Sequence, residues 1–325
     1  MKGIPQRDGT LSILIPWDGL TPINQVLTFA RSLGGRDARL ALLPVAPALK
    51  AGGARIAELA ESQSELKPMH PLVQMIELPA VRADPVAGIG AVAAKHDVDL
   101  ILMATPCHPA GELDPSCLAA QLALDSPTPV MVVQFDCTNL AAFPPRITRL
   151  LVPLDGSIRA AEALPFTVSM ASRLRVPVRL VMVIDPVQAL PPAFAYDPTA
   201  SDMLAGLRGE AHWTLTQAEQ LLARRGVRVS SDLLTGPVVR SLEAAVEPGD
   251  VLVMTTHGLG SALRGRLGSV AARMVADIPA PLIIMRGSPP VEVAVGAFDE
   301  RNRYQPVSRA SGNAPTPRRM GGMPA

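Results

Sequence analysis

The chain has 325 residues, of which 48% are apolar and 3% aromatic, and its formal net charge is +1. The length allows two domains with aliphatic cores, and the near-zero charge excludes an overall basic surface for nucleic acid or an anionic membrane. The cysteines Cys107, Cys117 and Cys137 form no C-x-x-C pair and no ligand set with the histidines, so neither disulfides nor a zinc site is indicated. No secretory signal and no apolar run of roughly 20 residues are visible, so we expect a cytoplasmic protein without membrane or nucleic-acid partners.

The first half begins with an apolar strand followed by an amphipathic helix. The strand runs into Pro16-Trp17-Asp18-Gly19, and the helix is expected from Thr21 to Leu33. A later strand is expected at 99–105, and a helix that starts at Leu118 leads to a closing strand after Pro129. This alternation of strands and helices is typical of α/β folds.

The second half shows the same alternation more completely. Continuous apolar runs such as 178–184 indicate strands buried on both faces, and therefore parallel strands covered by helices. The expected strands are 149–154, 178–184, 227–234, 250–255 and 281–285, and the expected helices are 159–175, 203–225, 238–247 and 268–276. Five strands with four connecting helices predict an open doubly wound sheet.

The chain also repeats itself once. Pro153-Leu154-Asp155-Gly156 matches Pro16-Trp17-Asp18-Gly19, the segment 250–256 matches 99–105, and both halves close with a Pro-x-Pro strand. The order and spacing agree, so we predict two tandem doubly wound open parallel five-stranded sheets of Rossmann-like type. The expected limits are 1–10 for an N-terminal extension, 11–133 for a first domain, 134–148 for a linker, 149–286 for a second domain and 287–325 for a disordered tail.

The two copies differ in length. Asp18 and Thr105 are 87 positions apart, whereas Asp155 and Thr256 are 101 apart, so the second copy is 14 residues longer. The Pro-rich stretch 186–201 directly follows the second strand and is the expected insertion. It would lie at the edge of the sheet where α/β folds bind ligands.

A glycine-containing loop follows the fourth strand of the second copy. The sequence runs Thr255-Thr256-His257-Gly258, then nine residues, then Gly268-Ser269 at the start of a helix. Gly258 lets the backbone approach a ligand, and the free N–H groups at the helix start favour an anion. The arginines between the glycines, Arg264 and Arg266, can neutralise phosphate charge. Because Asp155 ends the first strand at the same rim, a nucleotide can lie across this crevice.

These features together resemble the universal stress protein family. The resemblance rests on the Pro-x-Asp-Gly-Ser start, the spacing Gly258-x9-Gly268-Ser269 and the closing Pro-x-Pro strand. It covers the second half and, more faintly, the first. Known members share the five-stranded fold, and one branch binds ATP through a Gly-x2-Gly-x9-Gly-Ser/Thr loop. The resemblance therefore implies ATP, alone or with Mg²⁺, as the ligand. It places adenine near the end of the second strand, ribose near Asp155 and the phosphates at the loop. The implied set is Pro153, Leu154, Asp155, Val183, Met254, Thr255, Gly258, Gly268, Ser269 and Val270.

The sequence departs from the family pattern at the first glycine, where it has Thr255. A side chain there is tolerated in extended backbone but narrows the room for a ligand. In the first copy, Cys107 and Ser116 stand where the second copy has its two loop glycines, and Pro106 and Pro109 remove N–H donors. We therefore predict that the first half binds no nucleotide.

Simpler interpretations exist for each of these residues. Asp155-Gly156-Ser157 can be an ordinary turn, and capping of the helix is sufficient to explain Ser269. His257 has no carboxylate or nucleophile at a recognisable spacing. No catalytic or metal-binding residue is therefore assigned. The leading hypothesis is a non-catalytic, ATP-dependent regulator of the stress response. The alternatives are a nucleotide-free interaction module and a slow ATP hydrolase.

The resemblance also implies an assembly. It predicts an intramolecular pseudo-dimer in which the closing strands, 130–133 and 282–285, pair with each other and so protect two sheet edges. A homodimer of the tandem is a further expectation.

Overall fold

The computed structural model describes ten segments of the chain: 10–17, 23–34, 38–45, 73–75, 84–106, 118–135, 146–190, 199–256, 267–277 and 280–287. The chain divides into two compact units, Met1–Val291 and Glu292–Ala325, and all described residues belong to the first. The expected limits of the two domains stay predictions.

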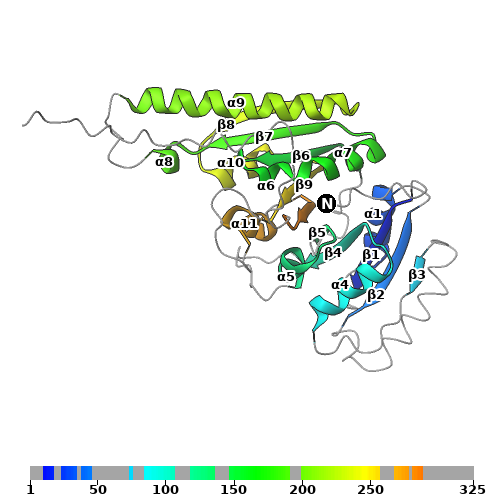
Figure 1. Cartoon of the computed structure of the whole chain (residues 1–325). Coiled ribbons are helices and arrows are strands. Elements are labelled where there is room, and N and C mark those ends of the chain that lie inside the picture. Colours follow the sequence, from blue (N-terminus) through cyan, green and yellow to red (C-terminus); the bar gives the residue numbers. More distant parts are fainter. Residues whose placement is uncertain are drawn as a thin grey trace, which may run out of the picture. The chain divides into compact units, whose positions relative to one another are not determined.

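The described residues of the first half form five strands, labelled in Figure 1. Its elements are β1 (Ser12–Trp17), α1 (Ile23–Gly34), β2 (Arg39–Pro44), β3 (Val73–Met75), α4 (Pro85–Lys95), β4 (Leu100–Pro106), α5 (Leu118–Asp125) and β5 (Val130–Phe135). The closing strand β5 thus runs two residues beyond the expected end of the first domain at 133.

In the second half, too, the part that the structure describes contains five strands. Its elements are β6 (Arg149–Leu154), α6 (Ile158–Ala161), α7 (Ala163–Leu174), β7 (Val178–Ile184), α8 (Pro186–Ala189), α9 (Ala200–Arg224), β8 (Val229–Thr235), α10 (Val238–Ala245), β9 (Asp250–Thr255), α11 (Ser269–Asp277) and β10 (Leu282–Met285). The predictions for β6, β7 and β9 are confirmed to the residue, and the other predicted bounds agree within three residues.

One predicted helix is wrong in its continuity. The helix expected over 159–175 is two helices, α6 and α7, separated at Glu162. Pro165 explains the break, because its ring has no N–H and clashes with the carbonyl of the residue four positions earlier, Ala161. Proline is tolerated in a first turn, so the chain restarts a helix at Ala163.

All ten strands form a single sheet with the order β3-β2-β1-β4-β5-β10-β9-β6-β7-β8. The pairs within each half are parallel, and β10 pairs antiparallel with β5 through Leu282↔Val132, Ile283↔Met131 and Ile284↔Val130. In both halves the first strand lies between the second and the fourth, so the doubly wound α/β fold is confirmed.

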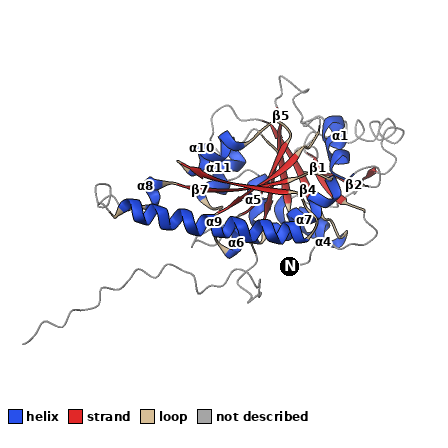
Figure 2. Ribbon diagram, turned by 90° about the horizontal axis from the view of Figure 1, so that it is seen from above, coloured by secondary structure: helices blue, strands red, loops and turns tan. Residues whose placement is uncertain are grey.

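Helices cover both faces of the second half (Figures 1 and 2). Helix α7 contacts α9, and α10 contacts α11. The cluster beneath α10 and α11 consists of aliphatic side chains and Met, among them Leu151, Leu252, Met274 and Ile284, all at most 1% exposed. A similar cluster in the first half includes Leu14, Ile101 and Val130. The aliphatic cores expected from the composition are therefore present.

An ionic cluster ties β6 to β9 at the edge where both strands begin. The guanidinium of Arg149 donates from Nε and Nη2 to the two carboxylate oxygens of Asp250, at 2.9 and 2.8 Å. The backbone N–H of Glu247 donates to the same carboxylate at 2.9 Å. The Asp250 side chain is 1% exposed, and its hydrogen bond to Arg149 raises the pKa of that guanidinium above its ordinary value. The buried carboxylate therefore lies against a charged partner.

The first half lacks this partner. Asp99 precedes β4 as Asp250 precedes β9, but Ser12 takes the place of Arg149 and gives only its backbone N–H, at 2.9 Å from Asp99 Oδ2. Burial raises the pKa of Asp99, although the hydrogen bond from Ser12 and the nearby Arg173 oppose this rise. The same position thus carries a paired carboxylate in one half and a desolvated one in the other.

Among the described residues, no helix is long and apolar enough to cross a membrane, and no group of three or more histidine, cysteine or acidic side chains is arranged to hold a metal ion.

Candidate functional site

The carboxyl ends of β6 and β9 define the candidate site. The paired register of these strands extends only from Arg149↔Asp250 to Leu151↔Leu252. By contrast, β6 stays paired with β7 up to Leu154↔Met182, and β9 stays paired with β10 up to Thr255↔Met285. The two central strands therefore separate over their last three residues. Because the chain order reverses between them, this is the switch point at which doubly wound sheets bind ligands.

A tight turn forms one side of this opening. Asp155 follows β6, and its Oδ1 accepts the N–H of Ser157 at 2.9 Å. Gly156 has φ of +82°, a conformation that glycine adopts without strain. Ser157 then caps α6, because its Oγ accepts the N–H of Ala160 at 3.0 Å. The Asp-Gly-Ser segment therefore has a structural role, as its simpler interpretation predicted.

The other side is formed by the junction of β9 and α11. Thr256 is fully buried, and its N–H donates to the carbonyl of Met285 at 2.9 Å. Its own carbonyl accepts the N–H of Gly268 at 2.9 Å, which brings the two ends of the loop together. The carbonyl of Gly268 accepts the N–H of Ala272 at 2.9 Å, so Gly268 occupies the N-cap position. The N–H groups of the first turn of α11 consequently have no partner within their helix.

The structure places nine of the ten predicted site residues around these two features. Pro153 and Leu154 end β6, Val183 is half-buried in β7, and Met254 and Thr255 end β9, while the rest lie in the Asp155 turn or at the start of α11. The Ser269 residue is exposed, whereas Val270 packs against the core cluster beneath α11. Gly258, together with His257, Arg264 and Arg266, lies outside the described residues.

Thr255 replaces the first glycine of the family pattern, a change that was expected to be tolerated in extended backbone. It is the last residue of β9, is 5% exposed and pairs with Met285. Its backbone is therefore extended, where a β-branched residue is unstrained.

The first half contains the same separation of central strands. There β1 and β4 are paired only at Ile13↔Leu100 and Leu14↔Ile101, while β1 remains paired with β2 as far as Trp17↔Pro44. The opening is thus a property of the fold, and the chemistry of the surrounding loops distinguishes the halves. Trp17 occupies the position that Leu154 has in the second half.

Two contacts across the β5–β10 pair were not predicted from the sequence. Gln134, at the end of β5, donates from Nε2 to the carbonyl of Val275 in α11 at 2.9 Å. Arg286, directly after β10, donates to the carbonyl of Asp125 at the end of α5 at 3.2 Å. Gln134 and Arg286 occupy equivalent positions after the two Pro-x-Pro motifs. This equivalence in the two copies was the sequence signal that could have indicated the contacts. Thr256 was also missed, although Thr105 repeats it in the first copy.

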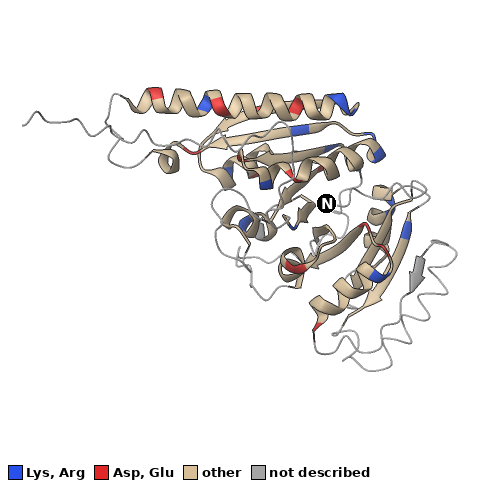
Figure 3. Ribbon diagram, viewed as in Figure 1, with Lys and Arg blue, Asp and Glu red and all other residues tan. Residues whose placement is uncertain are grey.

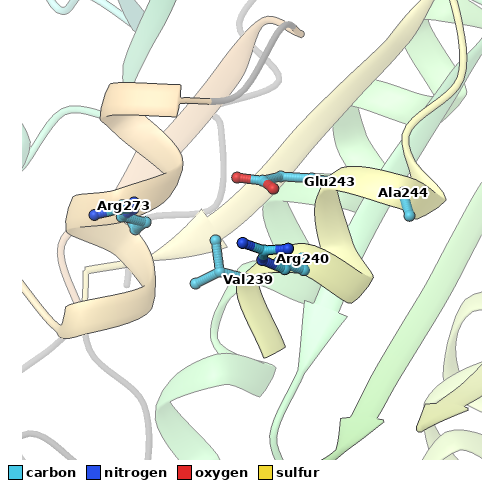
Figure 4. Close-up of a pocket in the computed structure, with 5 residues that line it drawn as sticks. All are labelled: Val239, Arg240, Glu243, Ala244 and Arg273. Carbon is cyan, nitrogen blue, oxygen red and sulfur yellow. The ribbon is translucent and has the colours of Figure 1, made fainter. Parts of the chain in front are cut away.

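A separate hollow of about 490 Å³ lies between α10 and α11 (Figure 4). It is lined by Val239, Arg240, Glu243, Ala244 and Arg273. None of the predicted nucleotide-binding residues lines it, so it is not the site that the sequence predicts.

The fold and the opening between its central strands define a doubly wound α/β protein with a switch-point site. The family model for the universal stress protein family matches residues 146–286, which contain this entire site. The second half of the chain is therefore similar to the universal stress protein family.

Two curated relatives share this similarity. A universal stress protein of Methanocaldococcus jannaschii is 26% identical over 142 residues, which cover 42% of this chain and 81% of the relative. A universal stress protein of Mycobacterium tuberculosis is 26% identical over 144 residues, which cover 44% of this chain and 49% of the relative. The chain thus spans about half the length of the mycobacterial protein.

Solved structures support the fold along most of the chain. A universal stress protein from Archaeoglobus fulgidus aligns over 88% of this chain and 99% of its own, with a TM-score of 0.57 and 17% identity. A functionally unknown protein from Pseudomonas aeruginosa aligns over 85% of this chain and 92% of its own, with a TM-score of 0.54 and 14% identity. At these identities the similarity shows the fold alone.

Proposed function

We propose that the second half binds ATP between the ends of β6 and β9 and that the protein is a non-catalytic, nucleotide-dependent regulator of the stress response. The observation that supports this most is that the opening after Leu151↔Leu252 in the second half adjoins the start of α11, where glycine, Gly268, is the N-cap residue. The opening places an aspartate turn opposite a helix start with free N–H groups, as a nucleotide requires.

The described residues suggest a role for each part of the ligand. The triphosphate would accept hydrogen bonds from the first-turn N–H groups of Ser269 and Val270, with the helix dipole favouring its charge. The carboxylate of Asp155 would accept a ribose hydroxyl, while its Oδ1 continues to hold the turn through Ser157. Adenine would lie near Val183, which is half-buried at the end of β7. Any Mg²⁺ would arrive with the phosphates, because no described cluster of ligands holds one beforehand.

The regulatory part of the proposal rests on α11. This nine-residue helix begins at the proposed phosphate contacts and, in its last turn, accepts a hydrogen bond from Gln134 of the first half. A ligand that shifts α11 would therefore alter the contact with β5, and the packing of the halves would in turn alter affinity for the ligand. The antiparallel pairing of β5 with β10 supports the pseudo-dimer that this coupling needs.

A second candidate is a nucleotide-free interaction module with the same fold. It is favoured by two observations: Thr255 occupies the first glycine position, and Asp155 already has a structural role in its turn. A slow ATP hydrolase is a weaker alternative, since the described residues offer no general base at the helix start.

Calorimetric titration of the purified full chain with ATP distinguishes the first two functions. We expect binding that Gly268→Val abolishes, because a side chain at the helix start fills the space next to the phosphates. Gly268 is not among the described glycines with a positive φ, so valine is compatible with the backbone there. Gly258→Val should act in the same way, and Cys107→Gly in the first half is the matched control that should change nothing.

Absence of binding at millimolar ATP, together with no adenine nucleotide released from the denatured protein, would favour the interaction module. Steady release of ADP that disappears in Asp155→Ala would favour the hydrolase.

A further inference from the structure

The hollow between α10 and α11 lies next to the candidate site. Helix α10 contacts β7 and α11 contacts β10, and the two strands between these, β6 and β9, are the ones whose carboxyl ends separate. Val239, which lines the hollow, packs against the cluster that contains Leu151 of β6 and Leu252 of β9. The hollow therefore lies above the same two strands that form the proposed nucleotide site, on the face that α10 and α11 cover.

Both helices begin at the edge of the sheet where that site lies. The strands of this half are parallel, α10 begins three residues after the end of β8, and α11 begins after the loop that follows β9. Arg240 is the third residue of α10, and Arg273 comes four residues after Ser269, the first residue of α11. Arg273 is thus about 6 Å along the helix axis and about 40° around it from Ser269, whose N–H is a proposed phosphate contact. Because helical side chains point back toward the N-terminus, we expect both guanidinium groups to lean toward this edge.

The charges around the hollow are not explained by contacts within the chain. A helix favours acidic residues in its first turn, but α10 has none there and has Arg240 instead. No ion pair joins Arg240 to any residue that the structure describes. The half-buried Glu243 extends from α10 into the hollow beside Arg240 (Figure 4). Together with Arg273 on α11, these side chains give the lining of the hollow a net charge of +1, which favours an anionic group.

The first half provides an internal comparison, because it lacks both arginines. Gln121 of α5 stands where α11 has Arg273, and α5 contains no basic residue (Figure 3). Helix α4 precedes the fourth strand of its half as α10 does, and it has no charged residue before Lys95 in its last turn. The first half is also the one predicted to bind no nucleotide. The two arginines therefore accompany the loop glycines and not the fold, which links them to a ligand.

We propose that the hollow between α10 and α11 is a phosphate-binding site and that it holds the terminal phosphate of the nucleotide bound between the ends of β6 and β9. This inference rests on the proposed function and extends it, because Arg240 and Arg273 then select a nucleoside triphosphate over a monophosphate. Guanidinium groups fit this role, since they donate charge-assisted hydrogen bonds to phosphate oxygens. Glu243 opposes the added negative charge, so the hollow accepts one phosphate group in preference to a longer polyanion.

Calorimetric titration of the full chain with ATP and with AMP tests the hollow separately from the rest of the site. The unmodified chain should bind ATP at least about tenfold more tightly than AMP. Arg240→Gln and Arg273→Gln should each weaken the binding of ATP about tenfold and leave that of AMP unchanged, because AMP has no phosphate that reaches the hollow. Glu243→Gln should strengthen the binding of ATP about threefold, because it removes a repulsive charge, and should also leave AMP unchanged. The control is Arg208→Gln, at an exposed arginine on α9, which should change neither affinity.

The outcomes distinguish this inference from the proposed function. Equal affinities of the unmodified chain for ATP and AMP overturn the inference alone, and so do arginine variants that bind ATP as the unmodified chain does or that weaken ATP and AMP equally. If the unmodified chain binds neither nucleotide, the proposed function fails, and the link between the hollow and the nucleotide fails with it. Titration with tripolyphosphate then tests the hollow by itself. Binding that both arginine variants weaken would retain a phosphate site for another ligand, and absence of binding would overturn the site.

Discussion

Two Arg–Asp pairs on neighbouring strands of the second half allow the cost of removing an arginine to be worked out from burial. Arg149 faces Asp250, whose side chain is 1% exposed, and Arg179 faces Asp232, whose side chain is 45% exposed. Arg149→Met keeps most of the aliphatic packing of the side chain but leaves the Asp250 carboxylate in the core with one described donor, the N–H of Glu247. An unpaired buried charge of this kind costs about 3 kcal/mol.

The equivalent change in the second pair should cost far less. Arg179→Met leaves the Asp232 carboxylate in contact with water, and it also removes a hydrogen bond to the carbonyl of Ala245. A partly exposed pair contributes about 1 kcal/mol or less to the free energy of unfolding. The two substitutions are chemically identical and differ mainly in the burial of the carboxylate that remains.

Urea denaturation followed by circular dichroism and by tryptophan fluorescence measures both losses, and coincident transitions are needed before a single free energy of unfolding is assigned. A third variant, Arg149→Met with Asp250→Leu, should regain most of the lost stability, because the buried charge is then gone. Equal losses for the two single variants, or a loss below about 1 kcal/mol for Arg149→Met, would refute the reasoning from burial.

Three shorter predictions concern other residues. Burial raises the pKa of Asp99, so the folded state holds the proton of this carboxyl more tightly than the unfolded state does. Stability is therefore lost as the pH rises through that raised pKa. The urea midpoint of Asp99→Asn should exceed that of the unmodified chain at pH 7, and the difference should vanish near pH 3. Gly249 has φ of +88°, and a Cβ there would lie 2.6 Å from Thr148 Oγ1, so Gly249→Ala should lower the free energy of unfolding by about 2–4 kcal/mol. A Cβ at Gly90 in α4 would have no atom within 4 Å, so Gly90→Ala should raise the free energy of unfolding by about 0.5–1 kcal/mol in the same denaturation assay. Asp155→Asn keeps an acceptor for the turn but removes the carboxylate, so calorimetry should show ATP affinity reduced about tenfold, with an unchanged melting temperature. An unchanged ATP affinity would show that Asp155 does not bind the ribose.

The fold was largely predictable from the sequence because its strands are continuous apolar runs. Strands such as 178–184 and 250–255 are buried on both faces, so the apolar residues within them indicated where the strands lie. The break between α6 and α7 was missed because amphipathic periodicity continues through Pro165, whose missing N–H and bulky ring interrupt the helix. In the first half, β3 is three residues long, too short for a periodic pattern to indicate it.

The candidate site was predictable in its position but less so in its chemistry. The positions followed from the duplication and from the rule that ligands bind at the carboxyl ends of parallel strands. The hydrogen bond from Ser157 to Asp155, by contrast, depends on a turn conformation that many Asp-Gly-Ser segments do not share. The link from Gln134 to α11 joins residues 141 positions apart, and no local pattern indicates a contact at that separation.

The duplication therefore separates what the fold requires from what a ligand requires. Both halves keep the opening between their central strands, although only the second has glycines at both corresponding loop positions. The opening alone thus predicts no ligand. What distinguishes the second half is the start of α11, where the N-cap residue, Gly268, carries no side chain. A single substitution at Gly268 consequently tests the nucleotide site more directly than any change in the Asp155 turn, because that turn also supports the fold.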